Sequence, residues 1–112
     1  MLPPANRLRK ETEIKRALAS PIRRKSGLLA CKTAANNLAA GRFCFIVSKK
    51  VSNKAVVRNK LKRRLRAATA GLLDRIKPGF DCVLIAFPGL ETKDYSEIAA
   101  TLQKVLAMAG II

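Results

Sequence analysis

The chain of 112 residues carries 23 lysines and arginines against 7 aspartates and glutamates, a net charge of +16. Hydrophobic residues make up 49% of it, enough for one core, so we expect a single domain over residues 1–112. Such a positive charge predicts a polyanionic partner. The sequence has no histidine and no Cys-x-x-Cys pair, which excludes a zinc site of the usual kind.

The three cysteines, Cys31, Cys44 and Cys82, are widely spaced, and each lies in an apolar run. There they are expected to act as small core residues. This usage fits a reducing compartment, so a cytoplasmic location is predicted. The sequence has neither a membrane-spanning apolar run nor a hydrophobic signal core, so no membrane partner and no export are expected.

The N-terminal third predicts an arm, a helix and a strand. Residues 1–10 (MLPPANRLRK) form a basic, proline-containing arm. In the segment that follows, Ile14, Ala17 and Leu18 have helical spacing, and Pro21 ends the helix. Residues 26–32 (SGLLACK) predict a short strand. Residues 33–41 (TAANNLAAG) are either a turn-rich connection or a helical turn.

The segment RFCFIVS, residues 42–48, is rich in aromatic and β-branched residues and predicts a strand. Its alternate residues are apolar on both sides, which favours a central strand covered on both faces. A cationic loop follows, in which Ser52 or Asn53 could cap the next helix.

The rest of the chain predicts a helix, a strand and a helix. A stripe at helical spacing indicates a helix over residues 54–76, and the apolar run over residues 80–87 indicates a buried strand. Asp94 and Glu97 form a capping-box-like start for a third amphipathic helix. The predicted class is α/β (α+β), one compact α-β sandwich in the order α-β-β-α-β-α. The stripe of the middle helix consists of Val57, Leu61, Leu65, Ala68 and Leu72.

The middle helix concentrates positive charge, because residues 56–68 contain no acid. With about 100° per residue, most of its cations lie on one exposed face beside the apolar stripe, flanked by Lys60 and Arg64. Arginine can make paired hydrogen bonds to phosphate oxygens and lysine supplies a point charge, so cations at this density are suited to binding phosphates. A merely solvated face would contain acids, and an anionic membrane would need a wider apolar stripe. The face consists of Arg58, Asn59, Lys62, Arg63 and Arg66.

The acids do not form an obvious catalytic or metal site. Cleavage of a phosphodiester by protein groups needs an acid-base pair or a carboxylate-held metal. The acids lie singly or at predicted helix starts, where they complement the helix dipole. No helix-turn-helix pair or base-stacking platform is evident either. The residues alone therefore predict a non-catalytic protein that reads the backbone of RNA or DNA.

The stretch FIVSKKVSNKAVVRNKLKRRLRAA, residues 45–68, closely resembles the signature of the bacterial ribonuclease P protein subunit. In that family a strand is followed by Ser-Lys-Lys, a short loop and Ala-Val-x-Arg-Asn-Arg-x-Lys-Arg on a long helix. Residues 5–10 (ANRLRK) resemble the family's N-terminal Asn-Arg-Leu-Lys/Arg-Lys. The resemblance implies a ribosomal protein S5 domain 2-like fold with a left-handed β-α-β crossover.

The resemblance also implies a function in transfer-RNA maturation. In the family, a large RNA subunit with bound Mg²⁺ removes the 5′ leader from precursor tRNA. The protein has no active site and no metal of its own, and it strengthens binding of the leader and of the catalytic ions. The implied partners are the ribonuclease P RNA subunit and the precursor leader, with no small-molecule substrate.

Residues that match the family's motifs are expected to contact RNA. They are Arg58, Asn59, Lys60, Lys62, Arg63 and Arg66 on the helix, Lys49 and Lys50 in the loop, and Arg7 and Arg9 in the arm. Lys60 replaces an arginine of the family motif. The family's leader cleft is usually lined by aromatics, whereas this chain has Ile14, Leu18 and, in the following strand, Leu29 at those positions.

Other classes of protein are compatible with the charge. A small basic ribosomal protein is the main alternative, and an architectural DNA-binding protein is another. A stand-alone nuclease is disfavoured by the missing histidines and the scattered acids.

Overall fold

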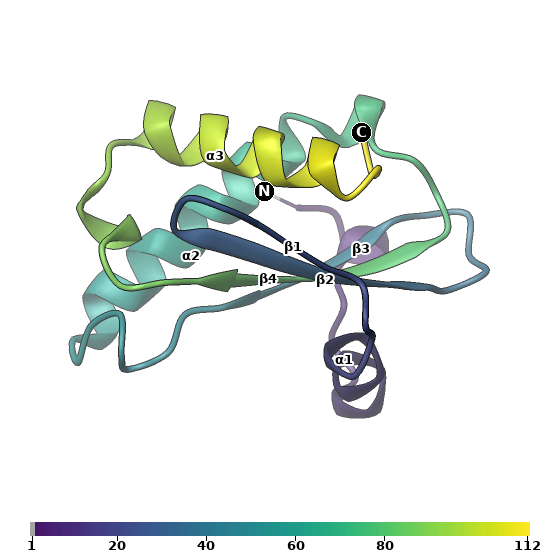
Figure 1. The fold of residues 1–112 in the computed structure, drawn as a ribbon, viewed down its shortest axis with the longest axis horizontal. Coiled ribbons are helices and arrows are strands. Elements are labelled where there is room, and N and C mark those ends of the chain that lie inside the picture. The colour runs from purple at the N-terminus through teal and green to yellow at the C-terminus, as the bar shows by residue number, and fades with distance from the viewer. Residues whose placement is uncertain (1) are drawn as a thin grey trace.

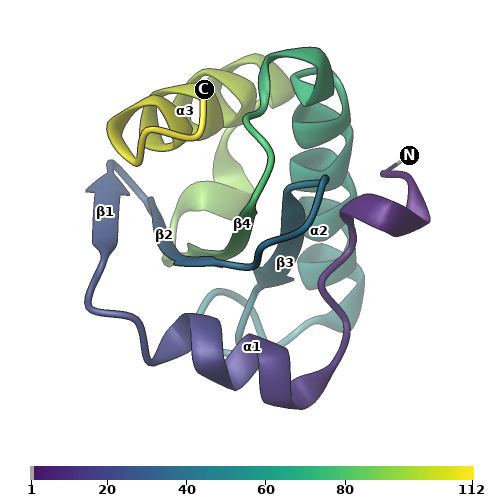
Figure 2. The same ribbon diagram turned by 90° about the vertical axis from the view of Figure 1, so that its right-hand side faces the viewer.

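The computed structural model describes residues 2–112, in which three α-helices pack against a four-stranded mixed sheet (Figure 1). Helices α2 and α3 cover one face of the sheet and α1 lies against the other (Figures 1 and 2). This arrangement confirms the predicted α+β class. In chain order the elements are α1 Glu11–Leu18, β1 Arg23–Ser26, β2 Leu29–Ala35, β3 Arg42–Ile46, α2 Ala55–Ala70, β4 Phe80–Ala86 and α3 Tyr95–Met108, with 3-10 turns at Pro4–Asn6, Leu73–Arg75 and Leu90–Thr92.

The strands lie in the order β1-β2-β4-β3. Strand β2 is antiparallel to both β1 and β4, whereas β3 is parallel to β4. Parallel neighbours need a crossover, and α2 supplies it between β3 and β4. The left-handed sense of this crossover stays a prediction from the resemblance.

The strand expected over residues 26–32 is a hairpin instead. Strand β1 ends at Ser26, and β2 begins at Leu29 and continues to Ala35. Between them Gly27 has φ +56°, a left-handed conformation that glycine adopts without steric cost. Strand β1 was missed because its sequence, RRKS, has no apolar residue to mark a buried face. The predicted order therefore gains one strand.

Strand β3 lies at the edge of the sheet, so its predicted central position is wrong. Both of its faces are nevertheless covered: Phe43 and Phe45 belong to the core under α2 and α3, and Cys44 and Ile46 pack with residues of α1. Apolar residues on both faces of a strand indicate that helices cover both faces. An edge strand can be covered in this way as well as a central one. Both faces of β3 are therefore covered as predicted, but only β4 pairs with it in the sheet, and its other edge has no neighbouring strand within residues 2–112.

Helix α2 is shorter than the predicted range of residues 54–76. It ends at Ala70, and the chain continues past Gly71 into the 3-10 turn Leu73–Arg75, which extends the apolar pattern. Its N-cap is Lys54 rather than Ser52 or Asn53, and no side chain caps it. In α3, by contrast, the Asp94 carboxylate accepts a hydrogen bond from the Glu97 amide at 2.8 Å, which confirms the predicted cap.

Two apolar clusters hold the layers together. The larger lies between the sheet and the two long helices and includes the buried stripe of α2, confirming that prediction for Leu61, Leu65 and Ala68. Cys31 and Cys82 are fully buried in it, as expected for core residues. The smaller cluster lies under α1 and is centred on Leu8, Ala17 and Val83.

A buried carboxylate joins α1 to the sheet. Asp81 on β4 is fully buried and accepts two hydrogen bonds from Arg42 on β3, each of 2.8 Å. Asn36 donates to it at 2.8 Å and Arg16 of α1 at 3.2 Å. Arg42 also donates to Glu13 of α1 at 2.8 Å. These five residues, the Asp81 network, fix two strands and a helix relative to one another.

The network shifts the pKa values of its acids. Burial raises the pKa of Asp81, but hydrogen bonds from Arg42 and Asn36 lower it, and the net result is below the ordinary value. The hydrogen bond from Arg42 likewise lowers the pKa of Glu13. Both acids are therefore ionised in the folded protein at neutral pH.

We expect Asp81→Asn to lower the free energy of unfolding by about 3 kcal/mol, because it leaves Arg42 without its buried partner. The matched control is Glu11→Gln, which removes only an exposed pair with Lys15 and should change stability by less than about 0.5 kcal/mol. Urea unfolding monitored by circular dichroism measures both values. Equal stability of the two variants would contradict a structural role for the network.

The same network should make the fold sensitive to acid. Because the folded-state pKa values of Asp81 and Glu13 lie below their ordinary values of 3.8 and 4.5, their stabilisation is complete above those values. It is lost as the pH falls through the folded-state pKa values. Urea unfolding at a series of acidic pH values should show a steeper loss for the wild type than for Asp81→Asn; parallel curves would refute this.

Candidate nucleic-acid interface

Helix α2 presents its cations to solvent on one side of the molecule. Arg63 and Arg66 are exposed, as are Asn59 and Lys60, whereas Arg58 and Lys62 are half-buried. Leucines at every fourth position bury the opposite side of the helix, so the cations cannot turn inward. The structure thus places all six predicted α2 residues outside the core.

Two cations at the margins of this surface make internal contacts. The Arg58 guanidinium donates to the Ser52 carbonyl at 2.9 Å and so ties the first turn of α2 to the preceding loop. The Arg64 guanidinium donates to the Lys93 carbonyl at 3.1 Å, toward the start of α3. Arg58 therefore has a structural role besides any contact with a partner.

The positive charge of α2 is not neutralised within the protein. The ion pairs among residues 2–112 involve Lys15, Arg16 and Arg42, and none involves a cation of α2, of the following loops or of the arm. Like charges held this closely repel one another, which costs folding free energy. A partner that supplies negative charge would relieve this repulsion.

The loop between β3 and α2 carries the two predicted lysines. Lys49 and Lys50 are exposed, and the neighbouring Val51 is buried in the larger core. The Val51 amide donates to the Ser48 carbonyl at 3.0 Å, which closes a tight turn. The buried valine holds the lysines at a defined place beside α2.

The N-terminal arm lies along the free edge of β3. The Leu8 amide donates to the Phe43 carbonyl at 2.9 Å, and the Asn6 side chain donates to the Gly41 carbonyl at 2.8 Å. Leu2 and Leu8 are almost completely buried. These contacts cover the strand edge and bring the cations of the arm close to α2.

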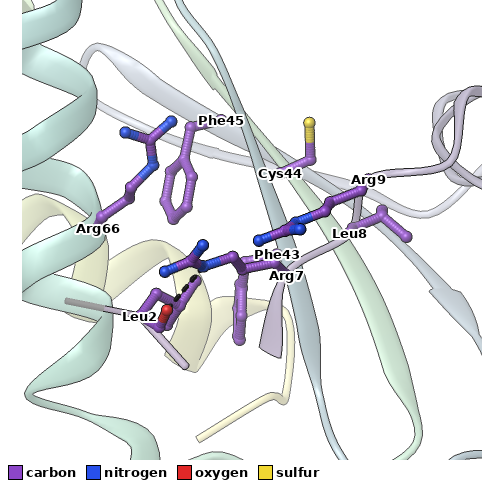
Figure 3. Close-up of a pocket in the computed structure, with 8 residues that line it drawn as sticks. All are labelled: Leu2, Arg7, Leu8, Arg9, Phe43, Cys44, Phe45 and Arg66. Carbon is purple, nitrogen blue, oxygen red and sulfur yellow. Dashed lines mark hydrogen bonds between the residues drawn. The ribbon is translucent and has the colours of Figure 1, made fainter. Parts of the chain in front are cut away.

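A groove of about 400 Å³ separates the arm from α2 (Figure 3). Arg7 and Arg9 extend into it from the arm, and Arg66 extends from α2 toward Phe45 (Figure 3). Arg7 is held in place by a 2.7 Å hydrogen bond from its Nε to the Leu2 carbonyl. The groove thus unites two separately predicted sets of cations in one site. Its lining consists of Leu2, Arg7, Leu8, Arg9, Phe43, Cys44, Phe45 and Arg66.

Cys44 of β3 is one of the residues that line this groove. Burial raises the pKa of its thiol, although the positive charges of Lys62 and Arg66 act in the opposite direction. The net shift keeps it protonated at neutral pH, so it contributes an apolar wall rather than a nucleophile.

The residues proposed for the leader cleft do not all share one surface. Ile14 and Leu18 of α1 are half-buried and pack with Ile46 and Ile85 on the α1 face of the sheet. Leu29 is fully buried in the larger core, on the opposite face. Alternation along β2 explains this, because Ala30 and not Leu29 points toward α1.

The α1 face contains an aromatic side chain that the sequence reasoning missed. Phe87 follows β4 and is half-buried, and the Lys25 ammonium lies 4.3 Å from its ring centroid. Lys25 pairs with Ala30, which pairs with Ile85, so these residues form one row on the α1 face. The alternation of the apolar run, continued two residues beyond Ile85, could have indicated the face of Phe87.

Within residues 2–112, no three histidine, cysteine, aspartate or glutamate side chains gather where they could hold a metal ion. Glu13 and Asp81 share one partner, because both accept hydrogen bonds from Arg42. In the same residues no helix is both long and apolar enough to cross a membrane.

Comparison with known proteins identifies relatives over most of the chain. A ribonuclease P protein component from Cyanothece sp. is 37% identical over 99 residues, which cover 86% of this chain and 76% of the relative. The ribonuclease P protein component of Pseudanabaena sp. is 34% identical over 113 residues, 100% of this chain and 97% of the relative.

Solved structures show the same fold. A Staphylococcus aureus RNase P protein mutant with defective mRNA degradation activity gives a TM-score of 0.88 at 26% identity, covering 96% of this chain and 91% of that one. The Thermotoga maritima RNase P protein in complex with 1-(4-fluorophenyl)-2-thiourea gives 0.82 at 26% identity, covering 89% and 96%. The family model for ribonuclease P matches residues 2–110, and the chain belongs to the ribonuclease P protein family.

Proposed function

We propose that this chain is the RNA-binding subunit of ribonuclease P and assists its RNA subunit in the Mg²⁺-dependent removal of the 5′ leader from precursor tRNA. The observation that carries the proposal is the cationic surface of α2, which forms no salt bridge with an acid of residues 2–112 and joins the arm at one groove. A phosphate-rich partner supplies the charge that the protein itself lacks.

The chemistry in this proposal belongs to the RNA. Hydrolysis of a phosphodiester needs a positioned acid and base or a metal-activated water. Glu13 and Asp81 are engaged with Arg42, and Asp94 caps α3. Mg²⁺ prefers several oxygen ligands and retained waters, which the acids of this chain do not offer together. The ions are therefore held by the RNA subunit and the substrate, and the protein strengthens their binding by positioning RNA.

The arm, the loop and α2 form the surface for the RNA subunit. Arg7, Arg9 and Arg66 around the groove can donate paired hydrogen bonds to phosphate oxygens. Lys49 and Lys50 extend the same charge beyond the first turn of α2, and Lys60 adds a point charge where the family has an arginine. Because these groups lie on packed elements, little backbone order remains to be gained on binding.

The α1 face of the sheet is the proposed surface for the leader. Ile14 and Leu18 replace the usual aromatics there, but Phe87 provides one ring on the same face, with the Lys25 ammonium over that ring. Stacking of a base on an aromatic ring contributes about 1–3 kcal/mol. Unpaired leader bases would thus find apolar contact along the face and stacking at one end.

The remaining expectations follow from this role. Processing of precursor tRNA places the protein in the bacterial cytoplasm, with no membrane and no small-molecule substrate. The alternative of a ribosomal protein is not favoured, because the relatives and solved structures are named as ribonuclease P proteins.

Cleavage of a 5′-extended precursor tRNA at low Mg²⁺ tests the role directly. The reaction is run with the RNA subunit alone, with the protein alone and with both. We expect cleavage only when the RNA is present, and a marked stimulation by the protein. No stimulation would contradict the accessory role, and cleavage by the protein alone would contradict the assignment of the chemistry to RNA.

Replacing Arg63 with alanine should weaken assembly with the RNA subunit without changing stability, because Arg63 is exposed and makes no hydrogen bond within residues 2–112. One lost phosphate contact should reduce the dependence of log affinity on log salt by about 0.7–0.9. The matched control is Arg75→Ala, an exposed arginine beyond α2. Filter binding over a salt series measures the slopes, and equal losses for both variants would refute the assigned face.

A further inference from the structure

Strand β1 carries three consecutive exposed cations, which lie outside the stretches that resemble the family's motifs, residues 5–10 and 45–68. They are Arg23, Arg24 and Lys25, called here the β1 ridge. None of the three lies within salt-bridge distance of an acid in the described chain. The ridge occupies one edge of the sheet, whereas the arm and α2 border the other edge, beyond β3.

Cations on an edge strand also discourage pairing with another strand. That effect accounts for the charge at the edge but not for the position of Lys25. Its ammonium lies over the Phe87 ring at 4.3 Å, next to the half-buried Ile85. Arg23 and Lys25 point to the α1 face, because they pair with Lys32 and Ala30. Arg24 lies between them, pairs with Cys31 of the larger core and points to the opposite face. The ridge is therefore continuous with the face proposed for the leader.

We propose that the β1 ridge binds the sugar-phosphate backbone of the single-stranded leader after it has crossed the α1 face. This inference rests on the proposed function and extends it to the part of the leader farther from the cleavage site. Strands lie about 4.8 Å apart, so the ridge is about 14 Å from β3. A leader must therefore reach a minimum length before its phosphates meet these cations.

The chemistry of the two surfaces assigns the leader rather than the RNA subunit to the ridge. Unpaired bases need apolar and aromatic contact as well as phosphate contact. Such groups lie beside the ridge, where Phe87 and Ile85 are half-buried. The folded RNA subunit already has a surface of α2, loop and arm on the opposite edge. One single strand can follow the α1 face from there to β1.

The test compares precursor tRNAs with two leaders, one too short to reach β1 and one long enough to pass it. The ridge variant combines Arg23→Thr, Arg24→Thr and Lys25→Thr, since threonine keeps the strand propensity. The control combines Arg75→Thr, Lys77→Thr and Lys104→Thr, which replace exposed cations of the 3-10 turn Leu73–Arg75, the segment after it and α3. Both proteins lose the same net charge. Affinity is measured on holoenzyme assembled with the RNA subunit in Ca²⁺ or another non-catalytic divalent ion.

We expect the ridge variant to lose affinity for the long-leader precursor by on the order of tenfold, and its salt slope to fall by about 1.4, which is about 0.7 for each of the two cations on the α1 face. Its affinity for the short-leader precursor and the affinities of the control should stay within twofold of wild type. An equal loss with both leaders would overturn the proposal, because the ridge would then contact the tRNA body or the RNA subunit. No loss with either leader would also overturn it.

A second measurement uses the wild-type chain, so it does not depend on the variant folding. Amine-reactive labelling of Lys25 in the holoenzyme should slow several-fold with the long-leader precursor and not with the short one. Unchanged labelling would refute the contact. If the wild-type protein fails to stimulate cleavage at all, the proposed function itself is wrong, whereas stimulation without protection of Lys25 refutes only the ridge.

Discussion

The buried carboxylate of Asp81 is the contact on which the arrangement of the functional surfaces depends. A charge removed from water must be fully paired, and here the partners come from β3, the β2–β3 connection and α1. Satisfying one anion therefore fixes the edge strand and the helix on the α1 face together. The arm is hydrogen-bonded to that edge strand, so the groove beside α2 and the face beneath α1 are set by the same interaction.

The distribution of acids complements this arrangement. The few carboxylates serve inside the fold or at helix starts, as in the Asp81 network and the Asp94 cap, and α2 has none. Adding glutamates to α2 would reduce the repulsion among its cations, but it would also place negative charge against phosphates. The helix instead derives its stability from Leu61 and Leu65, which are buried beneath it. Packing thus offsets the electrostatic cost of a surface kept free for RNA.

The elements that could be predicted from the sequence are those with a periodic apolar pattern. Helix α2, helix α3 and strand β4 each have one such pattern. The apolar stripe of α2 defines its buried side, so the cations of α2 were correctly placed outside the core. Strand β1 has no apolar residue, so only its pairing with β2 identifies it. The edge position of β3 depends on strand order, which local sequence does not encode. Leu29 and Ala30 point to opposite faces of β2, and the sequence alone does not say which of the two faces α1. The face of Phe87 follows from the alternation along β4 continued beyond Ile85.

Under the proposed function, the position of the aromatic contact has a consequence for how a leader would be held. Rings on α1 would grip bases near the centre of the face, whereas Ile14 and Leu18 offer apolar contact without stacking. Phe87 lies at the end of β4, close to the β1 ridge, so stacking and positive charge occur together at the far side of the sheet. Binding energy for an unpaired strand would then increase toward its distal nucleotides. In the proposed role, a face built in this way would favour longer leaders and would read little base identity, because stacking accepts any base and phosphate contacts carry no sequence information.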